Sequence, residues 1–265
     1  MSGERVVLVT GASRGIGAHL VAHFAARGDR VVWCSRSVAD VAPGGRVVPV
    51  QADVSDEAAV RDLMRLIRRT FGRLDVVVNN AGIALMNPAA LMPTQAIDRI
   101  MDVNFKGTVL VSRESVKLMQ RSRFGRIINM SSVAVPMRIE GESIYAASKS
   151  AVETFTRIFA KEVYPLGITC NAVGPAPVNT DLIRGVPKEK INALVARLAT
   201  RELASVEDVA HVVSFLAAPA HKDLNMYNTF YPQVLFELNG GKSAVCGQCS
   251  AAGALSAAVP EKQAA

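Results

Sequence analysis

Short apolar runs alternate with longer amphipathic segments along most of the chain. Runs of valine and isoleucine that are apolar on both faces are typical of parallel strands, and apolar residues spaced three and four apart are typical of the helices covering them. The pattern predicts an α/β domain with a doubly wound parallel sheet, whose ligand site lies beyond the carboxyl ends of the strands. The strands are expected at 6–10, 31–35, 47–51, 74–79, 126–131, 168–173 and 234–238, and the helices at 16–27, 56–71, 93–120, 145–164 and 206–217.

This pattern weakens toward the end of the chain. Residues 182–198 have an interrupted helical pattern, and 242–265 are rich in alanine, glycine and serine without periodicity. We therefore expect a single domain at 1–241 followed by a disordered tail. The tail carries Cys246 and Cys249, but no second cysteine pair or nearby histidine completes a zinc site, so we interpret the pair as incidental and expect no metal.

Composition narrows the class of protein. Half of the 265 residues are hydrophobic, which allows a substantial core, and no run of roughly eighteen apolar residues predicts a membrane span. The net charge is +7, and the arginine-rich segment 61–73 is expected to be a solvated helix face rather than a nucleic-acid site, because only 5% of residues are aromatic. The chain enters a strand without a signal peptide, and Cys34 and Cys170 lie in apolar strands, so we expect a reducing cytoplasm.

Three glycines separate the first predicted strand from its helix, in VVLVTGASRGIG. Gly11, Gly15 and Gly17 would let the backbone turn tightly and approach a pyrophosphate at the positive end of the helix. A plain tight turn has the same residues, but the strand, turn and helix together favour nucleotide binding.

The end of the second strand bears on the choice of cofactor. Folds that prefer the non-phosphorylated dinucleotide place an acid here to hold the ribose hydroxyls, whereas this chain has Ser35 followed by Arg36. Arg14 lies within the glycine turn. Two guanidinium groups without a carboxylate predict NADP(H), unless both arginines are merely exposed.

Two further strand ends carry polar residues. Asp53 could accept a hydrogen bond from an adenine amino group with Val54 beside the ring, or could simply precede a helix whose N-cap is better assigned to Ser55. In N-N-A-G at 79–82, buried asparagines are expected to pin neighbouring strands, and Gly82 leaves room for the cofactor.

The stretch SIYAASKSAVETF carries the most specific chemistry. Tyr145 and Lys149 are four residues apart, so they share one face of the predicted helix. An ammonium group close to the phenol would lower its pKa from about 10 and make Tyr145 a proton donor. Ser132 closes the preceding strand and could hold a substrate oxygen beside the tyrosine. Taken alone, such a tyrosine–lysine pair is commonly a surface pair.

Together these features resemble the short-chain dehydrogenase/reductase family, in the branch whose glycine turn reads T-G-x-x-x-G-x-G. The resemblance implies a Rossmann fold and extends from about residue 6 to residue 241. It rests on T-G-A-S-R-G-I-G at 10–17, Asp53, N-N-A-G at 79–82, V-N-F at 103–105, S-S at 131–132, Y-A-A-S-K at 145–149 and N-A-V-x-P at 171–175.

The resemblance implies roles for individual residues. Tyr145 is the acid/base, and Ser132, which has the family spacing that Ser131 lacks, polarises the carbonyl. Lys149 lowers the tyrosine pKa and binds the nicotinamide ribose, and Asn104 positions a water that passes protons to Lys149. The residues expected to bind the cofactor are Gly11, Ser13, Arg14, Gly15, Ile16, Gly17, Ser35, Arg36, Asp53, Val54, Asn80, Ala81, Gly82, Tyr145, Lys149, Pro175, Val178 and Thr180.

Within the family, the sequence is most similar to 3-oxoacyl-[acyl-carrier-protein] reductases and polyketide-type ketoreductases. This implies reduction by NADPH of a 3-oxoacyl thioester or a related ketone. Two alternatives stay open: an NAD(P)-dependent dehydrogenase of a sugar, polyol or steroid-like alcohol, and a non-catalytic cofactor-sensing protein. Pocket walls are expected from 133–144 and 182–204, where Met137 and Ile139 fit either a pocket or the core.

The resemblance also suggests macromolecular partners. Arg123 and Arg126 form a basic cluster where such reductases meet an acidic acyl carrier protein, although Leu166 replaces a second basic residue usual in those enzymes. The apolar face of the helix at 145–164 is buried against a partner subunit in family members, which implies a homotetramer or homodimer.

Two departures from the family pattern concern loops. Residues 218–233 form an insertion, which is expected near the substrate mouth, at a subunit interface or as a plain surface loop. In the segment 171–181, Pro175 fixes the turn, and Val178 and Thr180 are expected to hold the carboxamide of the cofactor. Ala176 stands where the family usually has glycine, and this predicts a slightly different loop path.

Overall fold

The computed structural model describes residues 4–38, 45–181, 183, 186, 188–198, 201–221, 225 and 228–230. The predicted strand at 234–238, the predicted tail at 242–265, and Cys246 and Cys249 lie outside these residues. None of the helices within the described ranges is long and apolar enough to cross a membrane.

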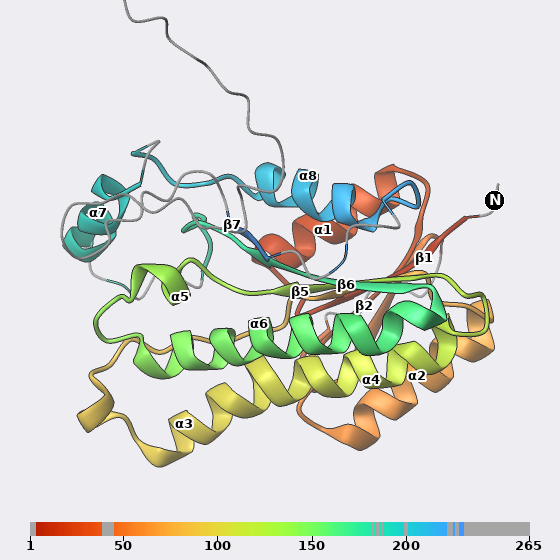
Figure 1. Ribbon diagram of the computed structural model, residues 1–265, viewed down its shortest axis with the longest axis horizontal. Coiled ribbons are helices and arrows are strands. Elements are labelled where there is room, and N and C mark those ends of the chain that lie inside the picture. The colour runs from red at the N-terminus through yellow and green to blue at the C-terminus, as the bar shows by residue number, and fades with distance from the viewer. Residues whose placement is uncertain are drawn as a thin grey trace, which may run out of the picture. The chain divides into compact units, whose positions relative to one another are not determined.

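The described strands form one parallel sheet in the order β3-β2-β1-β4-β5-β6-β7, which confirms the doubly wound α/β fold (Figure 1). The order reverses between β1 and β4, and ligands bind at such a point in doubly wound sheets. The last strand lies within the segment that the sequence indicates as an inserted loop. The strands are β1 (Val6–Thr10), β2 (Arg30–Ser35), β3 (Val47–Gln51), β4 (Val76–Asn79), β5 (Gly125–Met130), β6 (Ile168–Gly174) and β7 (Asn228–Phe230).

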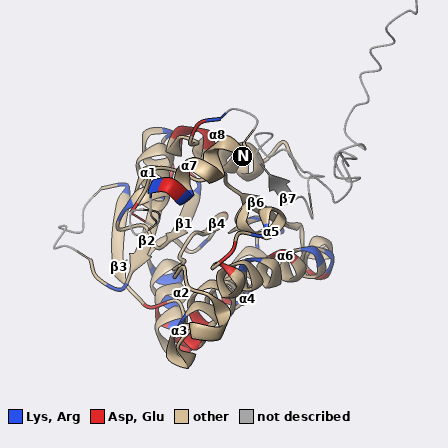
Figure 2. Ribbon diagram, turned by 90° about the vertical axis from the view of Figure 1, so that its left-hand side faces the viewer, with Lys and Arg blue, Asp and Glu red and all other residues tan. Residues whose placement is uncertain are grey.

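Helices cover both faces of the sheet (Figures 1 and 2). On one face, α1 (Gly15–Ala26) and α8 (Val206–Ala217) share a core with Val7 and Val9 of β1. On the other, α2 (Glu57–Phe71), α4 (Gly107–Met119) and α6 (Ser143–Val163) share a core with Val6 and Leu8. Each apolar strand therefore contributes to two cores, which is why its sequence lacks the alternation of a half-exposed strand.

The long helix predicted over 93–120 is interrupted. It consists of α3 (Thr94–Met101), a π-helical turn η2 (Asp102–Lys106) and α4. π-Helical turns frequently lie at functional sites. The remaining short elements are η1 (Ala89–Leu91), α5 (Ala134–Met137), η3 (Tyr164–Leu166) and α7 (Lys188–Ala196).

The start of α2 corrects the assignment of its N-cap. Asp56, not Ser55, caps the helix, and its carboxylate accepts a hydrogen bond of 2.8 Å from the Ala58 backbone N–H. Ser55 instead donates to Asp53 at 2.6 Å. Most arginines of the segment 61–73 are exposed, as expected for a solvated face.

Asparagine side chains tie the strands together beneath the site, as the sequence predicts. Asn79 donates to Asn129 Oδ1 across β4 and β5 at 2.8 Å, and Asn129 in turn donates to Thr156 of α6 at 2.8 Å. Asn80 donates to the carbonyl oxygen of Thr10 at 2.9 Å, which joins the end of β4 to the glycine turn after β1.

Candidate active site

Two adjoining cavities open at the carboxyl ends of the strands. The first, here called the glycine groove, runs over the turn after β1 and the ends of β2, β3 and β4. The second, here called the tyrosine pocket, lies between the ends of β5 and β6 and the start of α6. They meet at the shared residues Ile16, Asn80, Gly82 and Thr180.

The start of α1 suits a phosphate group. Arg14 is the N-cap residue, but its side chain makes no capping hydrogen bond, and the first turn contains no acidic residue. The positive end of the helix thus has no side-chain cap from Arg14 and no acid in its own first turn, and it faces the glycine groove. These features fit the pyrophosphate of the dinucleotide that the glycine spacing predicts.

The glycines of the turn are needed for close packing. Gly11 has a φ of 65°, and a Cβ there would lie 2.5 Å from the Cα of Ala81. A Cβ on Gly17 would lie 2.5 Å from Asn80 Nδ2. Any side chain at either position would push the turn away from the end of β4, so these two glycines shape the groove from below.

Both predicted arginines line the glycine groove, together with Ser35. Arg14 forms an ion pair of 3.4 Å with Asp181, and its side chain is 73% exposed, so it keeps donors available to a ligand. Ser35 donates to the carbonyl oxygen of Ser37, and the described residues that directly follow β2, 36–38, include no carboxylate. The groove thus has guanidinium groups, not an acid, at the end of this strand.

Asp53 has a partner that the sequence does not reveal. Arg99 of α3 donates to Asp53 Oδ2 at 2.8 Å, while Ser55 donates to Oδ1. Burial raises the pKa of Asp53, but the hydrogen bonds from Arg99 and Ser55 outweigh it and lower the pKa to about 2. Asp53 remains on the wall of the groove beside Val54, as a charged and paired carboxylate.

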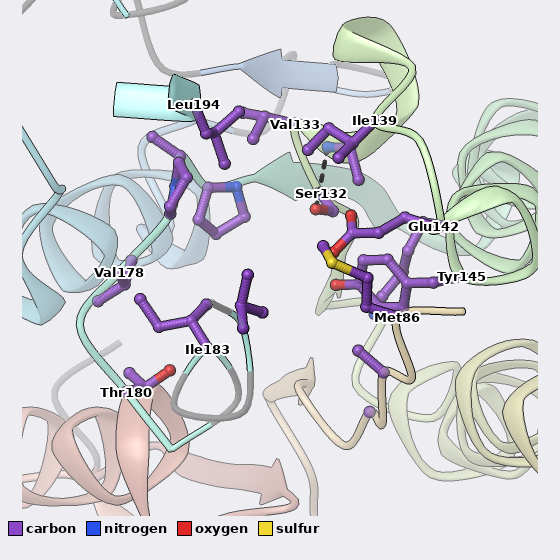
Figure 3. A pocket seen from close by; sticks show the side chains of 18 of the residues that line it. Met86, Ser132, Val133, Ile139, Glu142, Tyr145, Val178, Thr180, Ile183 and Leu194 are labelled. Atoms are coloured by element: carbon purple, nitrogen blue, oxygen red, sulfur yellow. Dashed lines mark hydrogen bonds between the residues drawn. The ribbon is translucent and has the colours of Figure 1, made fainter. Parts of the chain in front are cut away.

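The tyrosine pocket brings together three of the four predicted catalytic residues. Ser132, Tyr145 and Lys149 all line it, and Figure 3 shows Ser132 and Tyr145 on its wall. Tyr145 and Lys149 come from the first turns of α6, and Ser132 from the loop after β5. Ser131 also lines the pocket, but its hydroxyl group donates to the buried Glu153 at 2.5 Å, whereas Ser132 forms a hydrogen bond with Tyr145. These contacts favour Ser132, and its role stays a prediction.

The expected lowering of the Tyr145 pKa is wrong for this structure. Burial raises the pKa of Tyr145 to about 12, which outweighs its hydrogen bond with Ser132, and the charge of Glu142 raises it further. The lysine does not act on the hydroxyl here, because Lys149 Nζ donates to the Met130 carbonyl oxygen at 2.8 Å and lies 5.8 Å from the centroid of the tyrosine ring. Tyr145 is thus held as a neutral phenol.

Lys149 is a buried cation that donates a hydrogen bond to the Met130 carbonyl oxygen. Its side chain is buried against the end of β5, and desolvation lowers its pKa to about 8. Gly82 lies beside it, since a Cβ there would be 3.3 Å from Lys149 Nζ and 3.4 Å from Asn104 Oδ1. The glycine therefore leaves the space that a larger residue would take from both polar groups.

Asn104 lies in the π-helical turn, fully buried and outside the lining of both cavities. Its carboxamide accepts from the Ile83 N–H at 2.8 Å and donates to the Ile83 carbonyl oxygen at 2.9 Å. It also donates to Ser148 at 3.0 Å, between the two helical residues that line the pocket. The proton-relay role implied by the family stays a prediction, while the contacts give Asn104 a clear part in holding the β4 loop.

The corner after β6 lies where the sequence places it. Pro175, Val178 and Thr180 line the tyrosine pocket, and the Pro175 carbonyl oxygen accepts from Val133 N–H at 3.2 Å. Ala176 is buried, and its φ is not positive, so alanine fits without strain. Ala176 therefore gives the loop after β6 no reason to take a different path, and the structure does not support that prediction.

Apolar side chains form most of the remaining pocket wall. Ile139 lines the cavity and also packs against the core on the α1 side, whereas Met137 belongs to that core and not to the pocket lining. Glu142 and Lys190 also line the pocket; both lie in the predicted wall segments 133–144 and 182–204, but no sequence signal singled them out. Further apolar lining residues include Leu85, Met86, Ile183, Val186, Ile191 and Leu194.

The basic cluster predicted for a carrier protein does not form. Arg126 is 2% exposed, lies 4.4 Å over the Phe124 ring and donates to the carbonyl oxygens of Gly125, Ala218 and Pro219. It is at the amino end of β5, about 13 Å along the strand from Met130, which lines the pocket. Arg126 is thus a buried structural residue, and the prediction that it meets a partner is wrong.

Comparison with known proteins gives consistent relatives. Residues 5–191 match the family model described as short chain dehydrogenase. A short-chain type dehydrogenase/reductase of Picea abies is 40% identical over 82% of this chain and 86% of its own length. The 3-oxoacyl-[acyl-carrier-protein] reductase of Synechocystis is 36% identical over 80% and 89%, and FabG of Escherichia coli is 32% identical over 81% and 90%.

A solved structure agrees with this assignment. The ligand-free aldohexose dehydrogenase of Thermoplasma acidophilum has a TM-score of 0.79 and 30% identity, covering 86% of this chain and 92% of its own. The glycine turn, the strand order and the tyrosine–lysine helix are therefore explained together: the chain belongs to the short-chain dehydrogenase/reductase family.

Proposed function

We propose that this chain is an NADPH-dependent ketoreductase that uses Tyr145 as its general acid. The observation that carries the proposal is the convergence of Ser132, Tyr145 and Lys149 in a pocket that adjoins the glycine groove. Membership of the family implies a nicotinamide cofactor, and the uncapped start of α1 suits its pyrophosphate.

The residues of the pocket have separate tasks in this proposal. A bound nicotinamide supplies the hydride. Ser132 donates a hydrogen bond to the substrate carbonyl, and the neutral Tyr145 hydroxyl donates its proton as negative charge develops on that oxygen. Lys149, released from the Met130 carbonyl oxygen, would hold the ribose hydroxyls and stabilise the phenolate left on Tyr145. Pro175, Val178 and Thr180 would orient the carboxamide.

The names of the relatives guide the choice of substrate. Several are 3-oxoacyl-[acyl-carrier-protein] reductases, and a mainly apolar pocket suits an acyl or polyketide-like ketone. The similarity to an aldohexose dehydrogenase favours the second candidate, oxidation of a sugar-like alcohol. Carrier-protein docking would rest on Arg123 alone, which is exposed and donates to the Pro165 carbonyl oxygen at 3.0 Å.

A screen of NADPH oxidation tests the function directly. The panel contains acetoacetyl thioesters, 1-tetralone as a cyclic ketone, quinones and sugars, with Tyr145→Phe as the blank. We expect ketone-dependent oxidation of NADPH that the blank lacks. Activity only in the direction of sugar oxidation would support the second candidate, and no activity with any compound would favour a non-catalytic protein.

The choice of cofactor gives a second test, on Arg36. Replacing Arg36 with aspartate is expected to lower the ratio of kcat/KM for NADPH to that for NADH by about 100-fold, because a charge-assisted pair with the 2′-phosphate is lost and a repulsive charge takes its place. Steady-state kinetics with both cofactors measures the ratio. Arg121→Asp, at an exposed position outside both cavities, is the matched control. An unchanged ratio in Arg36→Asp would refute the assignment.

We also propose that α6 forms a subunit interface. Phe155 and Phe159 stack at 4.8 Å, Phe105 meets Phe155 edge to face, and Ile158 is 56% exposed on this apolar hollow. Relatives in the family are commonly oligomeric.

Ile158→Glu is therefore expected to convert the assembly into smaller species, because a carboxylate cannot be buried there without a partner. Sedimentation velocity measures the change. Leu91→Glu is the matched control, because Leu91 is also an exposed aliphatic side chain (70% exposed). This variant should leave the assembly intact. A monomeric wild-type protein at micromolar concentration would contradict the proposal.

A further inference from the structure

A carboxylate lies inside the tyrosine pocket, among mainly apolar walls. Glu142 is three residues before Tyr145 and lines the same cavity. Figure 3 shows its carboxylate directed toward the part of the cavity that the hydroxyl groups of Ser132 and Tyr145 also reach, with Met86 beside it. An acid in this place costs free energy, so its role needs an explanation.

No structural partner accounts for this side chain. Glu142 occupies the N-cap position of α6 but makes no capping hydrogen bond, and no hydrogen bond or ion pair reaches its carboxylate from the described residues. The two lysines of the pocket are engaged elsewhere: Lys149 donates to the Met130 carbonyl oxygen at 2.8 Å, and Lys190 Nζ lies 3.8 Å from Met86 Sδ. Burial raises the pKa of Glu142, as expected for an acid without a partner.

We propose that Glu142 determines specificity by accepting a hydrogen bond from a hydroxyl group on the carbon next to the reacting carbonyl, so that α-hydroxy ketones are the preferred substrates. This inference rests on the proposed ketoreductase function and names a substrate class for the same pocket. Figure 3 shows the Glu142 carboxylate beside the hydroxyl groups of Ser132 and Tyr145. A substrate whose carbonyl oxygen is held by these two hydroxyl groups would therefore have its neighbouring carbon close to the carboxylate.

The chemistry of the carboxylate selects among ketones. A carboxylate offers only acceptors, so a hydroxyl donor on the substrate satisfies it, whereas a second carbonyl or an ether oxygen does not. A 3-oxoacyl thioester presents such a second carbonyl and is the poorer complement. The cavity, with a volume of about 310 Å³, lies at the lower end of the range for small-molecule sites and accommodates a bicyclic hydroxy ketone.

Glu142 also acts on Tyr145 through its charge, so the test must separate this effect from recognition. Two ketones that differ only in the hydroxyl group use the same proton donor. A change in the tyrosine therefore alters both rates equally, and the ratio of the two rates reports only on recognition of the hydroxyl.

The experiment compares 2-hydroxy-1-tetralone, 1-tetralone and 2-methoxy-1-tetralone by kcat/KM with saturating NADPH. The wild-type enzyme is expected to prefer the hydroxy ketone over both others by about 10- to 100-fold, the range of one hydrogen bond to a charged group. Glu142→Leu should abolish this preference, so that the ratio of kcat/KM for the hydroxy ketone to that for 1-tetralone falls to about 1. Glu142→Gln, which keeps one acceptor, should be intermediate. Glu140→Gln changes an exposed acid outside the pocket and should keep the preference.

Two outcomes would overturn the inference: a wild-type enzyme that does not distinguish the three ketones, or a Glu142→Leu enzyme that keeps the preference. The methoxy compound separates a donor from a merely larger substituent, since it has the size without the O–H. Equal use of the methoxy and hydroxy ketones would therefore also overturn it.

A binding measurement keeps the inference testable if no ketone is reduced. Dissociation constants of tetralin-1,2-diol and 1-tetralol, measured by ligand-observed NMR with NADP⁺ present, should differ in the same direction and converge in Glu142→Leu. Absence of turnover with this binding preference would reject the proposed function and support the role of Glu142. Turnover of ketones without a preference for the hydroxy ketone would support the proposed function and reject the role of Glu142.

Discussion

Tyr145→Phe is expected to lower kcat for ketone reduction by about 1,000-fold, since a positioned general acid contributes a factor of about 100 to 10,000. The ring and its packing remain, and only the hydroxyl group is lost. Its pKa, raised to about 12 by burial, keeps the phenol protonated in this structure, so the group is present as the donor at neutral pH. The dissociation constant for NADPH should stay within about threefold, because the hydroxyl acts on the substrate oxygen.

The control for this variant is another tyrosine of the same chain. Tyr164, at the end of α6, is 50% exposed and lies outside both cavities, so Tyr164→Phe should leave kcat unchanged. Single-turnover kinetics with NADPH fluorescence separates the chemical step from cofactor binding. Retention of more than about a tenth of the wild-type rate in Tyr145→Phe would show that another group donates the proton.

Lys149→Met is expected to abolish most of the activity and to make the protein without cofactor more stable. Lys149 is 4% exposed, and its pKa falls from 10.5 to about 8, a difference that corresponds to about 3 kcal/mol of unfavourable burial at neutral pH. Losing the hydrogen bond to the Met130 carbonyl oxygen offsets about 1 kcal/mol. We expect a net gain of about 2 kcal/mol, or about 5 °C in Tm.

The stability difference between Lys149→Met and the wild type depends on pH, and its direction follows from the lowered pKa of Lys149. Below about pH 8 both the folded and the unfolded protein bind the proton, so the full cost of burying the charge is present. Between pH 8 and 10.5 the unfolded state binds more protons than the folded state, and the stability of the wild type rises with pH. The advantage of Lys149→Met should therefore be largest at pH 7 and shrink toward pH 10.

Urea unfolding at pH 7 and pH 10 measures both effects. Lys161→Met, which removes an exposed lysine from the same helix, should change stability little at either pH. A loss of stability in Lys149→Met at pH 7 would mean that the ammonium is well accommodated in the fold. A gain combined with lost activity would identify a charge that is kept for function at the expense of stability.

Much of this site could be predicted from neighbouring residues alone. The apolar runs of β1 and the glycines after it specify a strand, a turn and a helix within a few residues of one another, and the order of such units implies the doubly wound sheet. The spacing of Tyr145 and Lys149 places both on one helix face, and the lining of the tyrosine pocket confirms it.

The tertiary structure decided the environment of these groups, because their partners are distant along the chain. Asp53 meets Arg99, and Arg126 is buried against Ala218 and Pro219, 92 and 93 residues away. Local spacing specifies which way a side chain leaves its helix or strand, but burial and pairing depend on which other segments pack there. This is why the sequence by itself determined the fold and the placing of Tyr145 and Lys149 on one helix face, and only the packed chain showed a buried arginine, a neutral phenol and an acid inside the pocket.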